Sequence, residues 1–199
     1  MTNVSENKKR FIDLVKTNVH RDGVDGLLLW LENSDFYIAP ASTHFHESYE
    51  GGLCEHSLNV YDHLSYLNKI YNANIPEETV TICALFHDLC KVGCYVVGEK
   101  NVKGPDGTWH KEPFYKWDEA NKFGGHGSKS VFVVQSYIKL HFDEATAINC
   151  HMGIENGNCN AILDAYRDNA LAFLLHVADM ASTIPAMNDY IGLRTGDAE

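Results

Sequence analysis

Hydrophobic residues recur along most of the chain at the three-to-four-residue spacing of amphipathic helices. In the segment from about Leu53 to Tyr71, for example, Val60, Leu64 and Leu67 fall on one face of a helix. The segment from Pro76 to Lys91 is apolar on nearly every side, so it is predicted to lie at the centre of a helical bundle. Further helices are expected at about 5–19, 24–31, 126–140, 143–152 and 160–183, the last with a break near Asp168-Asn169. The pattern therefore predicts an all-α fold.

Residues 94–124 interrupt this helical pattern. Tyr95 to Val97 and Trp109 to Trp117 are rich in β-branched and aromatic residues, and they flank the turn sequence Gly104-Pro105-Asp106-Gly107. We expect a small β-hairpin insertion at about 94–124. Its aromatic side chains would either stack on a bound base or pack against the helical body.

Composition and charge narrow the classes of partner. The formal net charge of −11 over 199 residues disfavours long nucleic acid or an anionic membrane held by charge. No segment approaches the roughly 18 apolar residues of a membrane helix, and the N-terminus shows no secretion signal. The six cysteines form no C-x-x-C pair, which argues against a zinc knuckle. A cytoplasmic protein with reduced thiols is expected, and its oligomeric state is left open.

Several polar side chains occur at positions that helical periodicity places near apolar faces. The pair His87-Asp88 lies near the end of the most apolar helix, where an isolated carboxylate is costly to bury. Any one buried histidine is more often a hydrogen-bonded core residue than a metal ligand. Six such groups, each on its own helix or helix end, instead predict a shared metal site. They are His56, His87, Asp88, His126, His151 and Asp179.

The order H…HD…H…H…D resembles the HD superfamily of metal-dependent phosphohydrolases. Residues 46–56, His46-x-x-Tyr49-x-Gly51-Gly52-Leu53-x-x-His56, are similar to the HH-x-Y-x-GGL-x-x-H element of its 3′→5′ exoribonuclease branch. Residues 87–91 are similar to the motif H-D-[ILV]-[GC]-K. The resemblance implies a single HD domain over 1–199, with an N-terminal helical extension at 1–40, the HD core at 41–184 and a C-terminal tail at 185–199.

The resemblance also implies roles for individual residues. The first metal would be held by His56, His87, Asp88 and Asp179, while His126 and His151 match the branch with two metals, in which Asp88 bridges. So nitrogen-rich a ligand set favours one or two divalent ions such as Mn²⁺, Fe²⁺, Co²⁺, Ni²⁺ or Zn²⁺ over Mg²⁺ alone. Asp88 and Lys91 are the expected catalytic residues. The expected substrate contacts are Lys91, His46 and Ser128.

The expected activity is hydrolysis of a phosphoester or phosphoanhydride bond by metal-activated water. The substrate would be a small phosphorylated molecule, either a nucleotide or a short oligonucleotide. Two alternatives stay open at this point. A di-iron oxygenase can use a similar His/Asp ligand set and would consume oxygen. A non-catalytic nucleotide-binding module would bind nucleotide without turnover.

Overall fold

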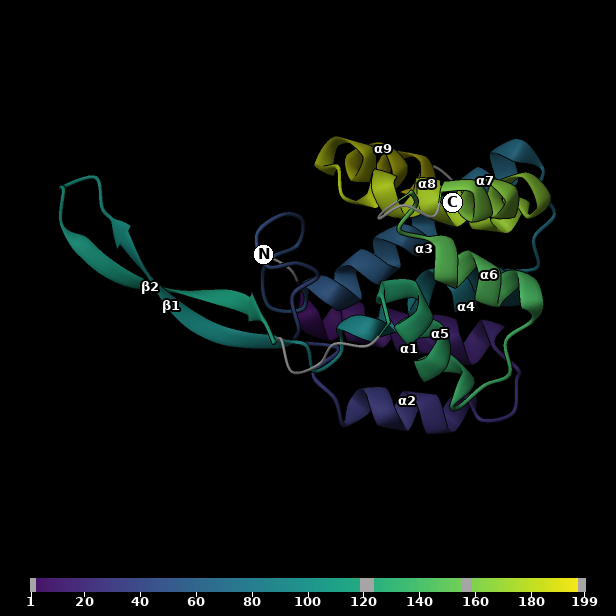
Figure 1. The fold of residues 1–199 in the computed structure, drawn as a ribbon, viewed down its shortest axis with the longest axis horizontal. Coiled ribbons are helices and arrows are strands. Elements are labelled where there is room, and N and C mark those ends of the chain that lie inside the picture. The colour runs from purple at the N-terminus through teal and green to yellow at the C-terminus, as the bar shows by residue number, and fades with distance from the viewer. Residues whose placement is uncertain (1–2, 119–123, 155–158, 197–199) are drawn as a thin grey trace.

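The computed structural model describes residues 3–118, 124–154 and 159–196, which form a helical body with one projecting β-hairpin (Figure 1). In chain order the helices are α1 (Val4–Asn18), α2 (Val24–Glu32), α3 (Gly52–Tyr71), α4 (Glu77–Phe86), α5 (His126–Gln135), α6 (Phe142–Cys150), α7 (Cys159–Asp168), α8 (Ala170–Ser182) and α9 (Pro185–Gly196). A short 3₁₀ helix, η1 (Leu89–Lys91), follows α4, and the strands are β1 (Tyr95–Lys103) and β2 (Trp109–Trp117). The prediction of a helical fold with an inserted hairpin is confirmed.

Helix α4 lies at the centre of the body, as its sequence predicted. Every residue from Thr79 to Phe86 is buried, and α4 packs against α1, α3 and α6. The helix ends at Phe86, earlier than the expected end at Lys91. The chain turns at His87 and Asp88 because Asp88 leaves the helical region, with φ −108° and ψ 18°. This turn places His87 and Asp88 at the end of an apolar helix rather than within it.

The N-terminal helices support the irregular segment that precedes α3. The ring of Phe11 in α1 is fully buried and lies 4.9 Å from the ring of Phe36 and 5.8 Å from that of Tyr37. Aromatic pairs at such distances stabilise a fold by more than the burial of their surface area alone would provide. The peptide N–H of Leu53 donates to the carbonyl of Ala39 at 3.0 Å, which fixes the segment to the start of α3. Residues 34–51 form no helix or strand, yet the Phe36 ring and the Ala39 carbonyl hold them to α1 and α3.

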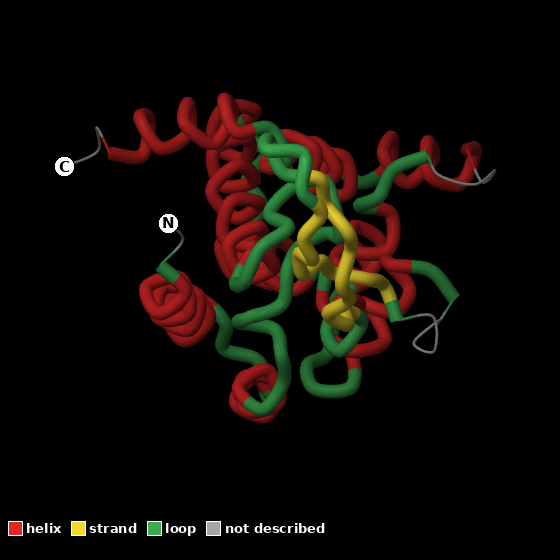
Figure 2. Tube along the Cα trace, turned by 90° about the vertical axis from the view of Figure 1, so that its left-hand side faces the viewer, coloured by secondary structure: helices red, strands yellow, loops and turns green. Residues whose placement is uncertain are grey.

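The hairpin is an antiparallel pair in which Tyr95 lies opposite Trp117 and Lys103 lies opposite Trp109. It extends away from the helices, and Figure 2 views it nearly along its length. At its base the Tyr95 hydroxyl donates to the carbonyl of Ala41 at 2.9 Å. Near its tip Trp109 is 69% exposed. The base therefore packs on the body while the tip does not, and residues 119–123 of the expected insertion lie outside the described residues.

The C-terminal part confirms one prediction and differs from another. The expected break near Asp168-Asn169 separates α7 from α8, and the side chain of Asn169 accepts from the N–H of Ala172 as an N-cap. The segment expected as a tail instead contains α9, which is attached to the body by a 2.8 Å hydrogen bond between His63 and Asn188.

Among the described residues, no single helix is long and apolar enough to cross a membrane. One pair of helices, α8 with the start of α9, passes the same test together but is bent by 110°.

Candidate metal centre

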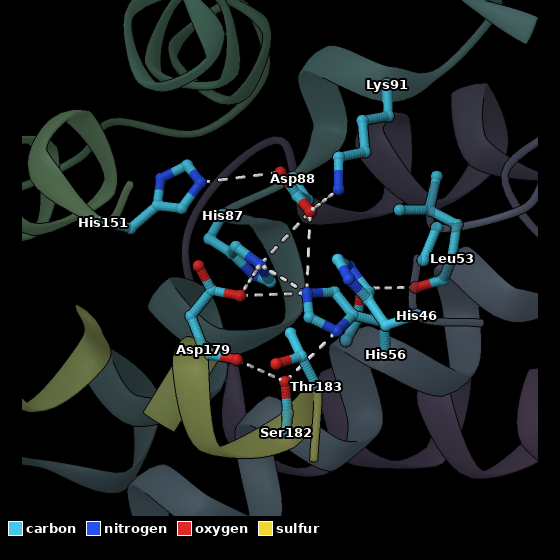
Figure 3. A network of polar contacts seen from close by, with 12 residues as sticks. His46, Leu53, His56, His87, Asp88, Lys91, His151, Asp179, Ser182 and Thr183 are labelled. Carbon is cyan, nitrogen blue, oxygen red and sulfur yellow. Dashed lines mark hydrogen bonds and ion pairs between the residues drawn. The ribbon is translucent and has the colours of Figure 1, made fainter. Parts of the chain in front are cut away.

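Three histidine side chains point the same ring atom, Nε2, toward the carboxylates of Asp88 and Asp179 (Figure 3). The Nδ1 of His87 lies 2.8 Å from the carbonyl of Ala84, and the Nδ1 of His151 lies 2.6 Å from the carbonyl of Ile148. A carbonyl only accepts, so both Nδ1 atoms carry the proton and both Nε2 atoms keep a free lone pair. Each ring is thus oriented by the last turn of its own helix, α4 or α6, as metal-binding imidazoles commonly are.

His56, in the first turns of α3, is oriented in the same way by a hydroxyl. The Ser182 hydroxyl donates to the carbonyl of Asp179 at 2.7 Å and lies 3.2 Å from the Nδ1 of His56. Having given its proton to the carbonyl, this hydroxyl accepts from Nδ1, which leaves the Nε2 of His56 without a proton. That Nε2 is 3.3 Å from the Nε2 of His87. Two unprotonated nitrogens this close repel each other unless a cation lies between them.

The two carboxylates complete the cluster. The Nε2 of His56 lies 3.1 Å from Asp179 Oδ1 and 3.6 Å from Asp88 Oδ2, and the Nε2 of His87 lies 3.5 Å from Asp88 Oδ2. Ligand atoms that share a cation at bond lengths of about 2.1 Å are themselves roughly 3 to 3.5 Å apart. His56, His87 and Asp88 therefore have the spacing of ligands that share one divalent cation, and Asp179 lies beside them, 3.8 Å from the Nε2 of His87.

A second position faces the other oxygen of Asp88. The Nε2 of His151 lies 3.5 Å from Asp88 Oδ1 and is buried without a hydrogen-bond partner among the described residues. Leaving such a group unpaired costs about 1–3 kcal/mol. His126 and Cys90 approach from the same side: the Cys90 sulfur is 3.8 Å from Asp88 Oδ1 and 3.5 Å from the Nδ1 of His126. Asp88 thus presents one oxygen to each position, as a bridging carboxylate would.

Lys91 is the positive group of the site. Its Nζ lies 2.6 Å from Asp88 Oδ2, and the residue is only 8% exposed. Burial acts to raise the pKa of Asp88, but the ammonium of Lys91 and the His87 ring hold it well below its usual range. Burial likewise acts against ionisation of Asp179, but the neighbouring rings of His56 and His87 lower the pKa of that carboxyl. Both carboxylates are therefore ionised and able to bind cations at neutral pH.

Two glycines permit the close approaches that assemble the site. A Cβ at Gly52 would lie 2.0 Å from the carbonyl oxygen of Glu47, so only glycine lets the 43–49 segment lie against the start of α3. A Cβ at Gly127 would lie 2.2 Å from the carbonyl oxygen of Asn149. This second contact joins α5, which begins at His126, to the end of α6.

The structure brings together most of the residues singled out in the sequence. His56, His87, Asp88, His151 and Asp179 share direct contacts of 3.8 Å or less with one another. His126 joins them through Cys90. Their ligand roles remain predictions, because geometry alone does not test binding.

The expected substrate contacts differ among themselves. The ring of His46 lies 4.9 Å from that of His56, and burial, together with the neighbouring His56 ring and Lys91 ammonium, lowers its pKa to about 4, so it is uncharged at pH 7. It lines a pocket of about 620 Å³ that also includes Glu47 and Thr183. The hydroxyl of Ser128, by contrast, donates to the side chain of Asn149 at 3.0 Å and joins α5 to α6.

Sequence reasoning missed three groups that contact the cluster. Ser182 orients His56, and Glu47 places a carboxylate oxygen 3.9 Å from the Nδ1 of His56. Cys90 lies within the H-D-[ILV]-[GC]-K element, and no role was predicted for it. Its position two residues after Asp88 is the sequence signal that could have pointed to it.

Fold and cluster together define a helical protein with a buried His/Asp centre suited to divalent cations. The chain belongs to the HD domain family, since residues 53–184, more than half of its length, match that family. The match confirms the resemblance and begins twelve residues after the expected start of the core at 41.

One curated relative is the dihydroneopterin 2′,3′-cyclic phosphate phosphodiesterase of Methanocaldococcus jannaschii. It is 29% identical over 132 residues, which cover 54% of this chain and 51% of the relative. The chain thus spans about half the length of that relative. No solved structure was found to match.

Proposed function

We propose that this chain is a metal-dependent phosphohydrolase that cleaves a phosphoester bond in a small nucleotide or nucleotide-like molecule. The observation that carries the proposal is the 3.3 Å approach of two unprotonated Nε2 atoms, those of His56 and His87, beside two ionised carboxylates. A cation is the group that relieves this arrangement. Membership of the HD domain family agrees with it.

Within this proposal, His56, His87, Asp88 and Asp179 hold one divalent cation, while Asp88, His126 and His151 hold a second. Bound cations of this kind supply Lewis acidity, activating water as a nucleophile and neutralising charge on a phosphate. The nitrogen-rich donors favour Mn²⁺, Fe²⁺, Co²⁺, Ni²⁺ or Zn²⁺ over Mg²⁺ alone.

The charges of the chain's own residues explain how so acidic a protein attracts an anion. Asp88 and Asp179 contribute two negative charges and Lys91 one positive charge, so the described cluster carries about one net negative charge before any cation enters. Divalent cations make it positive locally, although the whole chain carries −11. The ammonium of Lys91 lies 2.6 Å from Asp88, beside the proposed cations. From there it can donate to a non-bridging oxygen of a phosphate bound to those cations.

The substrate class is drawn from two observations. The relative is named for a 2′,3′-cyclic phosphate of a small heterocyclic molecule. The pocket of about 620 Å³ that His46 lines is of a size to admit such a molecule. We therefore propose a small cyclic or linear phosphodiester, rather than a long oligonucleotide, as the substrate. Within this proposal His46 contacts the uncharged part of the small phosphodiester.

The test uses protein stripped with a chelator and reloaded separately with Mn²⁺, Co²⁺, Ni²⁺ or Zn²⁺. Hydrolysis of bis(p-nitrophenyl) phosphate and of a panel of 2′,3′-cyclic nucleotides, monophosphates and triphosphates is then measured. We expect turnover that depends on the metal and falls about 10²-fold or more in Asp88→Asn. The matched control is Asp62→Asn, which removes a carboxylate of α3 that pairs with Arg10 at the surface.

Failure of every metal to support turnover on the whole panel would refute the proposal. Oxygen consumption by the iron-loaded protein, without hydrolysis, would favour the oxygenase alternative. Nucleotide binding without turnover would favour the non-catalytic module.

A further inference from the structure

We propose that the thiolate of Cys90 is a ligand of the second cation, which makes the two metal positions chemically different. This inference rests on the proposed function only in requiring that a second cation binds beside Asp88. The first position has nitrogen and oxygen donors alone. The second has a sulfur donor in addition.

The distances around Cys90 are those of a coordination shell. Its sulfur lies 3.5 Å from His126 Nδ1 and 3.8 Å from Asp88 Oδ1, and donor atoms of these three side chains all lie within 4.8 Å of one another. A cation about 2.3 Å from sulfur and about 2.1 Å from nitrogen and oxygen separates its ligand atoms by roughly 3.2 to 3.8 Å. The observed spacing falls in that interval.

The position of the sulfur is fixed by the backbone rather than by chance packing. The peptide N–H of Cys90 donates to the buried hydroxyl of Ser130 at 3.0 Å. This bond attaches η1 to α5 one turn after His126. The same two elements thus hold both the thiol and the imidazole, and the 1% exposure of Cys90 excludes solvent from the sulfur.

An independent observation at the same place indicates an absent ligand. The Nε2 of His151 belongs to a fully buried side chain, faces Asp88 Oδ1 and has no hydrogen-bond partner among the described residues. Cys90, His126 and Asp88 form one group of donors, and His151 approaches the same oxygen of Asp88, so a cation at this oxygen would take an N₂OS set of four donors. Four donors including one thiolate suit Zn²⁺ and disfavour Mg²⁺ and Mn²⁺. Binding replaces the thiol proton with the cation, and that proton leaves to solvent.

The first experiment loads the metal-free protein with Co²⁺ and records its absorption spectrum during titration. We expect two equivalents to bind, and the second to bring an intense near-ultraviolet band from thiolate-to-cobalt charge transfer. In Cys90→Ala the band disappears and affinity at the second position falls about tenfold or more, while the first equivalent still binds. The matched control is Cys83→Ala, since Cys83 is equally buried in α4 but is not among the donors at Asp88.

A second measurement needs no variant, so it tests whether the Cys90 sulfur binds a cation even if Cys90→Ala does not fold. X-ray absorption at the zinc edge of the wild-type protein with two bound Zn²⁺ should show about half a sulfur neighbour per zinc at about 2.3 Å, because only one of the two ions binds a thiolate. Two bound ions with only nitrogen and oxygen neighbours would overturn this inference and leave the proposed hydrolase intact. Failure to bind any divalent ion would overturn both.

Discussion

The buried ion pair between Arg21 and Glu144 yields a prediction whose size follows from the structure. The guanidinium donates to both oxygens of Glu144, at 2.6 Å and 2.7 Å, and the Glu144 side chain is 1% exposed. Thr79 and the N–H of His141 donate to the same carboxylate, each at 2.8 Å. Removing Arg21 leaves these two neutral donors around a buried negative charge. Breaking such a pair from one side costs about 3–5 kcal/mol.

Arg21→Ala is therefore expected to lower the free energy of unfolding by about 3–5 kcal/mol. For a chain of this size this is a fall in Tm of about 6–20 °C. The assay is thermal and urea unfolding followed by circular dichroism. Arg10→Ala is the matched control, because Arg10 is 46% exposed in its pair with Asp62 and such pairs contribute about 1 kcal/mol or less.

The double variant Arg21→Ala/Glu144→Gln sharpens the test. A neutral amide needs no counter-ion, so this protein should be more stable than Arg21→Ala alone. If Arg21→Ala costs no more than Arg10→Ala, then Glu144 is not held in a low-dielectric site and the reasoning is wrong.

The difference in unfolding free energy between wild type and Arg21→Ala depends on pH with a definite sign. Burial acts to raise the pKa of Glu144, but hydrogen bonds from Arg21, from the His141 N–H and from Thr79 lower it below its ordinary value of 4.5. Stability from this group is fully present above that ordinary value and is lost as pH falls through the lowered one. The difference in unfolding free energy between wild type and Arg21→Ala should therefore be largest near neutral pH and become smaller in acid.

Three further predictions concern the site and the hairpin. A divalent cation at 100 times its Kd should add about 2.7 kcal/mol to stability, or about 5–11 °C in Tm, and Asp88→Asn should abolish this shift in differential scanning fluorimetry. Gly127→Ala should weaken binding of the second cation in calorimetry, because the new Cβ would lie 2.2 Å from a carbonyl of α6. The control is Gly26→Ala, whose new Cβ would make only an ordinary 3.6 Å contact, so cation binding should stay unchanged. Weakened binding in this control would contradict the explanation given for Gly127→Ala. Tyr95→Phe should cost about 0.5–1.5 kcal/mol in urea unfolding, and no loss would mean that the hydroxyl does not fix the hairpin base.

Much of the helical body was predictable because its helices bury one face each. The polar pair His87-Asp88 at the end of an otherwise apolar helix was visible in the sequence. The structure places this pair against His56 and Asp179. Helix α9 was not predicted, because among its residues with described side chains only Ile191 is buried, so no apolar face marks it.

Other features depend on tertiary geometry that local pattern does not encode. Arg21 and Glu144 are 123 positions apart, and nothing near either one in the sequence indicates the other. The direction of the Cys90 sulfur depends on how η1 meets α5, which periodicity does not describe. The family match begins at residue 53. Arg21 lies before that point, and yet its ion pair with Glu144 holds α6, the helix that immediately precedes His151.

The hairpin's place of attachment has a mechanical consequence. The Trp117 ring at its root lies 5.3 Å from the Tyr95 ring and 5.5 Å from the His126 ring. Nine residues per strand give an arm of about 30 Å at 3.3 Å per residue. An arm of this length acts as a lever on Trp117, so a change in its angle would change the packing of the Trp117 ring against the His126 imidazole.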